Sequence, residues 1–132
     1  MSQADYDIFL NTIMLQYNNH GLLEDKMKEE VKLSEHGGTL TAKLCCEIDH
    51  HTAKRMREHI DHALFEKKPE KLILDFSEVG FMDSSGLGLI IGRAECATAV
   101  GATVVLSGLS GSTERLLRVC GIEKIKNLTV KK

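Results

Sequence analysis

A segment rich in serine and glycine is where the residue types and their spacing most clearly indicate chemistry. Residues 81–88 read FMDSSGLG and lie between a predicted buried strand and a predicted helix. Ser84 and Ser85 therefore stand at or near a helix N-terminus, where unpaired backbone N–H groups and the helix dipole favour an oxyanion or a phosphate. Gly86 and Gly88 would let another molecule approach the backbone closely.

The two serines allow three interpretations from the residues alone. Serine is a common N-cap, and capping would explain one of the two hydroxyls. A catalytic nucleophile is the second, but the G-x-S-x-G frame fails because Asp83 and Leu87 flank Ser85, and no histidine adjoins the segment in the sequence. A phosphate-binding loop of the P-loop type is the third, and it needs a lysine that does not follow Gly86.

The elements that position this segment alternate between strand and helix from residue 40 onward. Residues 71–77 read KLILDFS, a nearly continuous apolar run that is typical of a central strand covered on both faces. The element order predicts an α/β fold whose parallel strands are joined by right-handed crossovers. The predicted strands are 31–34, 39–46, 71–77, 102–106 and a short one within 122–130, and the predicted helices are 52–68, 85–100 and 110–119.

Apolar residues at helical spacing predict which side chains of these helices face the core. Asp49 stands where the first of the helices would begin. The predicted inward residues are Leu87, Ile90, Ile91, Ala94 and Ala97 in the second helix and Leu116, Leu117 and Val119 in the third.

Residues 1–28 form a separate segment in front of this pattern. Its large apolar residues recur at helical spacing, which predicts an amphipathic helix of about three turns. Ser2 and Asp5 resemble a capping box at its start. The apolar residues are Tyr6, Phe9, Leu10, Ile13, Met14 and Tyr17.

The composition excludes several classes of function. The chain has 132 residues, a formal net charge of −2 and 5% aromatic residues, which argues against nucleic-acid binding. No apolar stretch approaches the ~18 residues of a membrane span, and the first residues lack the features of a secretory signal. The cysteines lack the spacing of a redox or zinc site, so free thiols in a reducing cytosol are expected. They are Cys45, Cys46, Cys96 and Cys120.

Histidines and acids gather in the predicted helix over residues 52–68 and just before it. A metal pair is conceivable there, but the H-E-x-x-H spacing is absent and no third ligand is evident. We therefore expect a solvated helix face and neither a metal nor a cofactor. The residues concerned are His50, His51, Glu58, His59, Asp61 and His62.

Two separated motifs resemble one known family. Residues 81–93, FMDSSGLGLIIGR, closely resemble the signature of the STAS domain family, above all its bacterial anti-sigma-factor antagonists of the sporulation type. Residues 47–53, EIDHHTA, resemble that family's turn into its first helix. The segments KLILDFSEV and VVLSGL fit the strands before and after the signature helix, so the resemblance covers roughly residues 30–128.

This resemblance implies a STAS fold over residues 29–132, preceded by an N-terminal helical extension over residues 1–28. The implied fold is an α/β domain with a mixed four- to five-stranded sheet, parallel core strands and helices. The extra N-terminal amphipathic helix has no counterpart in the sporulation-type protein. We expect its apolar face to pack where a further C-terminal helix of the family would lie, or onto a second subunit. That face includes Tyr6, Phe9, Ile13 and Tyr17.

The resemblance also implies a regulatory protein of the bacterial cytoplasm without catalysis of its own. Family members bind an anti-sigma factor that is also a serine kinase, which frees a sigma factor. The kinase phosphorylates a serine in the signature loop, the antagonist lets go, and a serine phosphatase resets it. No nucleic acid and no membrane is implied as a partner. A STAS module of another signalling scaffold and a serine hydrolase using Ser84 or Ser85 stay open as alternatives.

Site residues carry over from the family pattern position by position. The second serine of the D-S-S-G string takes the phosphate, which is Ser85 here, with Ser84 as a secondary site. Asp49 is equally expected to contact the partner and to cap the helix that follows it. Leu87 and Ile90 are candidates both for the partner surface and for the core. The expected partner surface comprises Asp49, Asp83, Ser84, Gly86, Leu87, Ile90 and Arg93.

Overall fold

A five-stranded mixed sheet organises the protein, whose computed structural model describes residues 2–8 and 30–131. The strand order is β1-β2-β3-β4-β5. β1 pairs antiparallel with β2, and the remaining neighbours pair in parallel. The predicted mixed sheet with a parallel core is therefore confirmed. The strands are β1 (Val31–His36), β2 (Thr39–Leu44), β3 (Lys71–Asp75), β4 (Thr103–Ser107) and β5 (Leu128–Val130).

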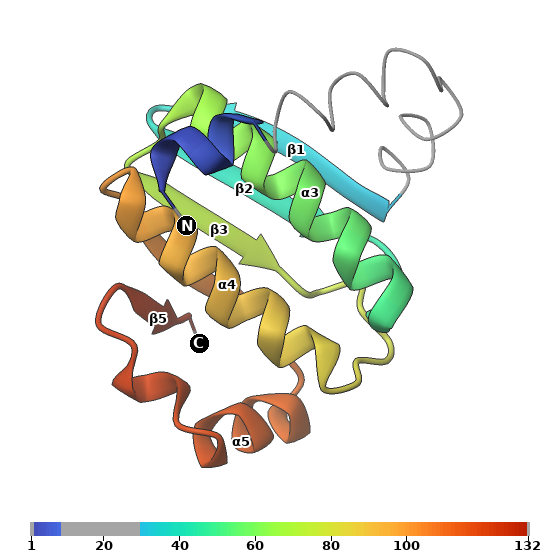
Figure 1. Ribbon diagram of the computed structural model, residues 1–132. Helices are drawn as coiled ribbons and strands as arrows, with labels where there is room; N and C mark the ends of the chain where they lie inside the picture. The colour runs from blue at the N-terminus through green and yellow to red at the C-terminus, as the bar shows by residue number, and fades with distance from the viewer. Residues whose placement is uncertain (1, 9–29, 132) are drawn as a thin grey trace.

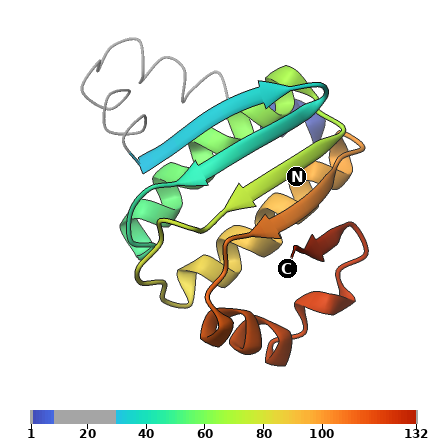
Figure 2. The ribbon, with the colours of Figure 1, turned by 180° about the vertical axis from the view of Figure 1, so that it is seen from behind.

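Two long helices cover one face of this sheet. They are α3 (His50–Lys67) and α4 (Ser85–Ala99), which lie side by side in Figure 1. The shorter α5 (Gly111–Val119) and the 3-10 helix η1 (Ile122–Lys124) lead into the edge strand β5. Seen from behind, in Figure 2, the strands face the viewer and both long helices lie beneath them.

The predicted burial of β3 on both faces is therefore wrong. Leu72 and Leu74 are buried against the helices, whereas Ile73 points to the other face and is only half-buried. A strand presents alternate side chains to opposite faces, and this face is not covered by either long helix. The apolar run at residues 72–74 thus reflects one buried face and one apolar residue on the open face.

The core lies between the sheet and the two long helices. Ala42, Leu74 and Leu106 stand in register across β2, β3 and β4 on the covered face. Met56 and Ile60 of α3 are fully buried above them. Burying each large aliphatic side chain contributes roughly 1.5–3 kcal/mol, so this layer fixes the two helices against the strands.

Three predicted core positions in the helices are wrong. Ile91 of α4 is 38% exposed, and Leu116 and Val119 of α5 are 59% and 84% exposed. In α4 the inward stripe runs through Gly86 and Arg93, whose residue types do not signal burial. In α5 the only buried residue is Leu117, since this short helix packs along a narrow stripe at the edge of the domain.

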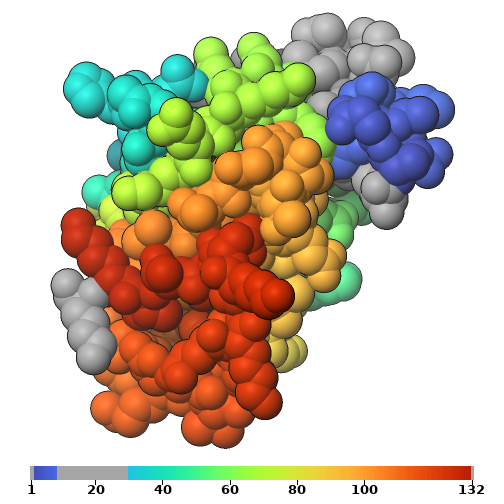
Figure 3. All heavy atoms as spheres, turned by 90° about the vertical axis from the view of Figure 1, so that its left-hand side faces the viewer, coloured from blue at the N-terminus to red at the C-terminus, as the bar shows by residue number. Residues whose placement is uncertain are grey.

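The N-terminal segment packs onto the helix pair. Residues 3–8 are helical, and Ser2 Oγ accepts a hydrogen bond from the Asp5 N–H at 3.1 Å, which is one half of the predicted capping box. Tyr6 is 4% exposed and its ring stacks on Phe65 of α3, with 3.6 Å between centroids. Figure 3 shows this turn and the C-terminal segment at opposite ends of one side of the molecule.

Most of the predicted N-terminal helix lies outside the described residues. Tyr6 alone of its apolar face is described, and it contacts α3 of the same chain. The division into an extension over 1–28 and a domain over 29–132 stays a prediction, as does packing onto a second subunit. The apolar residues outside the described part are Phe9, Leu10, Ile13, Met14 and Tyr17.

Candidate functional site

Two loops that follow neighbouring parallel strands meet in front of α3 and α4. The Ile48 N–H donates to the Phe81 carbonyl at 2.9 Å, and the Asp83 N–H donates to the Ile48 carbonyl at 3.0 Å. This short parallel bridge between Ile48 and Met82 aligns the two loops. Asp49 and Asp83, one residue further along each loop, are therefore placed at the N-termini of neighbouring helices. The two sequence motifs thus form one surface.

Asp49 is the N-cap of α3. Its Oδ1 accepts hydrogen bonds from the N–H groups of His51 at 2.8 Å and Thr52 at 2.9 Å. Thr52 Oγ1 accepts a hydrogen bond from the Asp49 N–H at 2.9 Å, which completes a capping box. The Thr52 and His51 backbone N–H groups hold the pKa of Asp49 below its usual value. The capping interpretation of Asp49 is confirmed, and its partner contact stays a prediction.

Asp83, and neither of the two serines, caps the start of α4. Its Oδ1 accepts a hydrogen bond from the Ser85 N–H at 2.7 Å. Ser84 occupies the N-cap position, but its side chain makes no cap hydrogen bond. The capping interpretation of the serines is therefore wrong. Neither hydroxyl makes a hydrogen bond within residues 2–8 and 30–131, so both are uncommitted there.

The two glycines of the segment differ in function. A Cβ on Gly86 would overlap the side chain of Met82, which folds over the first turn of α4. Gly86 is buried, so it serves internal packing and offers no exposed surface, and its contact with a partner stays a prediction. Gly88 is exposed, and a Cβ there would meet no atom within 4 Å. The helix surface beside Ser85 is therefore open.

The expected partner surface also changes at two positions of α4. Ile90 is fully buried and Arg93 is 3% exposed, so neither lines an exposed surface. Ser84 is exposed, and Ser85 and Leu87 are half-buried at the start of the helix. Phe81, which belongs to the signature string, is 55% exposed beside them. Its exposure could not be read from the sequence, because an aromatic residue next to a strand normally suggests burial.

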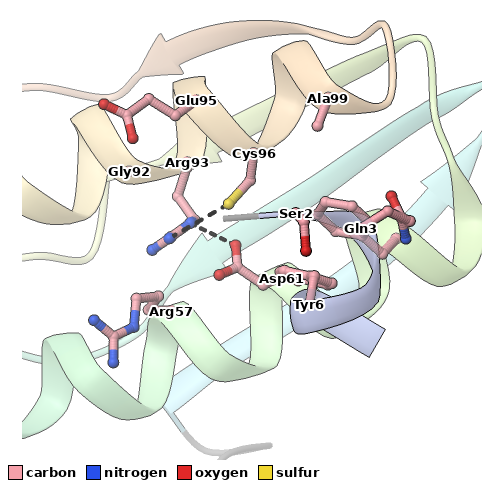
Figure 4. Close-up of a pocket in the computed structure, with 11 residues that line it drawn as sticks. Ser2, Gln3, Tyr6, Arg57, Asp61, Gly92, Arg93, Glu95, Cys96 and Ala99 are labelled. Carbon is pink, nitrogen blue, oxygen red and sulfur yellow. Dashed lines mark hydrogen bonds and ion pairs between the residues drawn. The ribbon is translucent and has the colours of Figure 1, made fainter. Parts of the chain in front are cut away.

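Arg93 forms a buried ion pair with Asp61 of α3. The Arg93 Nε lies 2.6 Å from Asp61 Oδ1, and the two residues are each 3% exposed. Figure 4 shows this pair between the helices, with Cys96 close to the guanidinium. Burial raises the pKa of Asp61 to about 6, against the opposing effect of Arg93. The prediction of a solvated face is thus wrong for Asp61.

A groove runs between the first halves of α3 and α4. It has a volume of about 290 Å³. His50 shares this groove with Ser85, but in the described part of the chain no hydrogen bond joins the imidazole to the hydroxyl. Within the described residues, no base is thus hydrogen-bonded to the serine hydroxyl, as it would be in an activated nucleophile. The lining residues are His50, Ala53, Lys54 and Arg57 from α3 and Ser85, Gly88 and Leu89 from α4.

The described ranges also bear on the expectations about metal ions, thiols and membrane spans. Within them, no cluster of three or more His, Cys, Asp or Glu side chains is arranged to hold a metal ion. The four cysteines are free thiols, of which Cys120 is exposed and the other three are half-buried. None of the helices in the same ranges has the length and apolarity to cross a membrane.

Comparisons with known proteins agree with this geometry. Residues 30–131 match the sequence model of the STAS domain. An anti-sigma F factor antagonist from Paenibacillus polymyxa is 33% identical over 99 residues, which cover 75% of this chain and 85% of that protein.

Two solved structures of the anti-sigma factor antagonist SpoIIAA have a similar fold. Its unphosphorylated form matches with a TM-score of 0.58 and 30% identity, over 67% of this chain and 81% of that one. The phosphorylated form from Bacillus matches with a TM-score of 0.60 and 27% identity, over 77% and 91% of the two chains.

Proposed function

Because this chain belongs to the STAS domain family and, within it, to the anti-sigma factor antagonists, we propose that it is a switch controlled by phosphorylation on Ser85. It binds an anti-sigma factor that is also a serine kinase, and so releases a sigma factor in the bacterial cytoplasm. Phosphorylation ends the interaction, and a serine phosphatase restores it. The family is regulatory and non-enzymatic, so the chain's own part is binding.

The observation that carries this proposal is the state of the Ser85 hydroxyl. The backbone N–H of Ser85 donates to Asp83 Oδ1 at 2.7 Å, while its side chain makes no hydrogen bond in the described part of the chain. A kinase therefore has no cap to break at this serine. The positive end of the α4 dipole also favours a phosphate there, so modification is compatible with the folded state.

Charge and desolvation explain how one phosphate would release a partner. A phosphoserine adds about −1.5 to −2 charges, which must lose their hydration in a closed interface. The carboxylates of Asp49 and Asp83 stand at the same helix N-termini and add repulsion. Every ~1.4 kcal/mol lost from binding lowers the affinity tenfold, so a few kcal/mol suffice to switch the partner off.

Intact mass spectrometry tests the assignment. Incubation with the cognate kinase and ATP should add one phosphate to the wild type, and Ser85→Ala should abolish this addition. Ser84→Ala is the matched control and should be phosphorylated as the wild type is, since Asp83 still fixes the helix start. A Ser85→Ala protein that is phosphorylated as fully as the wild type would contradict the proposal.

Binding to the anti-sigma factor completes the test. The phosphorylated wild type should bind at least tenfold more weakly than the unphosphorylated protein in a titration by calorimetry. Equal affinities of the two forms would show that phosphorylation at Ser85 does not control the partner.

A further inference from the structure

We propose that the groove beside Ser85 is an intramolecular phosphate-binding site. Once Ser85 carries a phosphate, Lys54 and Arg57 of α3, together with His50, bind that phosphate across the helix pair. The inference deepens the proposed function, on which it rests for the identity of the modified serine. It assigns to α3 a function in the phosphorylated state, in addition to its place in the core.

Spacing along the two helices brings these groups together. His50, Lys54 and Arg57 are four and then three residues apart, so they form one stripe on the surface of α3. Ser85 and Gly88 are three residues apart on the facing side of α4, and all five residues line one groove. The bridge between the loops before the helices keeps both helix N-termini at the same end of that groove.

The groove has room for a phosphate next to the serine. A side chain on Gly88 would meet no atom within 4 Å, so the surface one turn after Ser85 is open. The groove volume is about 290 Å³ before any modification. Long lysine and arginine side chains can reach across such a gap while their aliphatic parts stay on the helix surface.

The charges around the groove favour an anion. Its lining contains two permanent cations and a histidine but no carboxylate. In the described ranges, neither Lys54 nor Arg57 has an acidic side chain within ion-pair distance. Another cation of the same helix is satisfied elsewhere, since Arg55 pairs with Glu30 at 2.7 Å. Within those ranges, the two cations that line the groove with Ser85 thus form no ion pair of their own, and Arg57 acts on Asp61 only through its electrostatic field.

Neighbouring acids direct the phosphate toward these cations. Asp83 accepts the Ser85 N–H, so its carboxylate stays close to the modified side chain and repels the phosphate from the loop side. Asp61, one turn further along α3 than Arg57, is paired with Arg93. A phosphate bound by Lys54 and Arg57 gains charge-assisted hydrogen bonds, which makes the released form of the protein more stable in its own right.

A titration by ³¹P NMR tests the proposal without kinase or partner. Phosphoserine is installed at position 85 during translation, and its second pKa is measured in the wild type and in the double variant Lys54→Gln/Arg57→Gln. Nearby cations favour the dianion, so the wild-type pKa should lie below the ~6 of free phosphoserine. We expect the double variant to raise that pKa by about half a pH unit, as the loss of two exposed ion pairs implies.

Matched controls make the result specific. Lys67→Gln/Lys71→Gln removes the same charge from exposed positions far from the groove and should leave the pKa unchanged. Lys54→Arg/Arg57→Lys should keep the wild-type value. A second set of proteins carries His50→Gln, which separates the contribution of the imidazole from that of the two cations.

Equal pKa values in the groove variant and the control variant would overturn the proposal. Thermal unfolding of the unphosphorylated variants gives a second readout. They should melt as the wild type does, whereas with phosphoserine present the groove variant should melt at a lower temperature. The proposed function fails separately, by the kinase modifying another residue or by phosphorylation leaving partner binding intact, and neither result changes this titration.

Discussion

Asp49 and Asp83 cap two neighbouring helices, and this leaves the serines beside them uncommitted. Each aspartate accepts backbone N–H groups at the start of its helix, at 2.7–2.9 Å. Ser84 and Ser85 therefore stand at a helix N-terminus without serving it. Modification of a hydroxyl destabilises the fold least when that hydroxyl makes no native hydrogen bond. Because the aspartates cap the helices, both serine hydroxyls meet this condition in the described structure.

Asp61 gives the residue-scale prediction, which concerns pH. Burial raises its folded-state pKa to about 6, against ~3.9 in an unfolded chain. The folded state therefore holds an extra proton between these values, and the stabilisation present below pH ~4 is lost as the pH rises to about 6. Urea unfolding from pH 4 to 7 measures this effect. Relative to Asp61→Asn, the free energy of unfolding of the wild type should fall by up to about 3 kcal/mol across this window.

Groups from each packed element face Asp61 and enter this prediction. Arg93 and Cys96 lie on α4, Arg57 on the same helix as Asp61, and Tyr6 on the N-terminal turn. Arg93 opposes the shift, but burial outweighs it. Glu95→Gln is the control. Because Glu95 is an exposed acid of α4, the difference in unfolding free energy between this variant and the wild type should not change with pH. A difference between wild type and Asp61→Asn that does not depend on pH would contradict the raised pKa.

At the scale of elements, the N-terminal turn contributes an aromatic side chain to the helix pair. Tyr6 stacks on Phe65 and is 4% exposed, at the end of α3 opposite to Ser85. Burial raises the pKa of Tyr6 strongly, as expected for a phenol inside the domain. The turn thus extends the core of the domain beyond the five strands and the two long helices.

Removing the Tyr6 ring should destabilise the whole domain. Tyr6→Ala leaves a cavity against Phe65 and is expected to lower the free energy of unfolding by about 2–3 kcal/mol in urea titrations. Tyr6→Phe keeps the stack and should retain most of the stability. Deletion of residues 1–28 should act in the same direction as Tyr6→Ala. Unchanged stability of Tyr6→Ala would mean that the turn does not pack on α3 in solution.

The elements also show what sequence patterns can predict. Strand and helix order followed from alternating apolar periodicity, and the observed bounds differ from the prediction by a few residues. Periodicity fails at Arg93 and Asp61, because two charges buried as a pair look like solvent-exposed residues in the sequence. It also fails at Val119, since the stripe of an edge helix is narrower than its apolar residues suggest. The sequence could not show that Asp83 caps α4, because a serine is an equally common cap and only the three-dimensional geometry distinguishes the two.

At the scale of the whole molecule, the site lies at one end of the helix layer. The loops before α3 and α4 form the surface that carries Ser85, while Tyr6 and Phe65 close the layer at the other end. The core between helices and sheet involves neither serine hydroxyl. A charge added at Ser85 is therefore expected to change a surface and leave the sheet as it is.

Nuclear magnetic resonance can test whether the proposed switch is local. In ¹H–¹⁵N spectra, phosphoserine at position 85 should shift amides in residues 47–57 and 81–89 and leave those of β1, β4 and β5 in place. Ser110 is the contrasting position, because its Oγ accepts the Thr113 N–H at 3.2 Å as the N-cap of α5. Phosphoserine there removes a cap that is in use and should disturb the whole of α5. Widespread shifts from position 85, reaching β1, would contradict a local switch, because Ser85 contributes no hydroxyl hydrogen bond whose loss could propagate through the described structure.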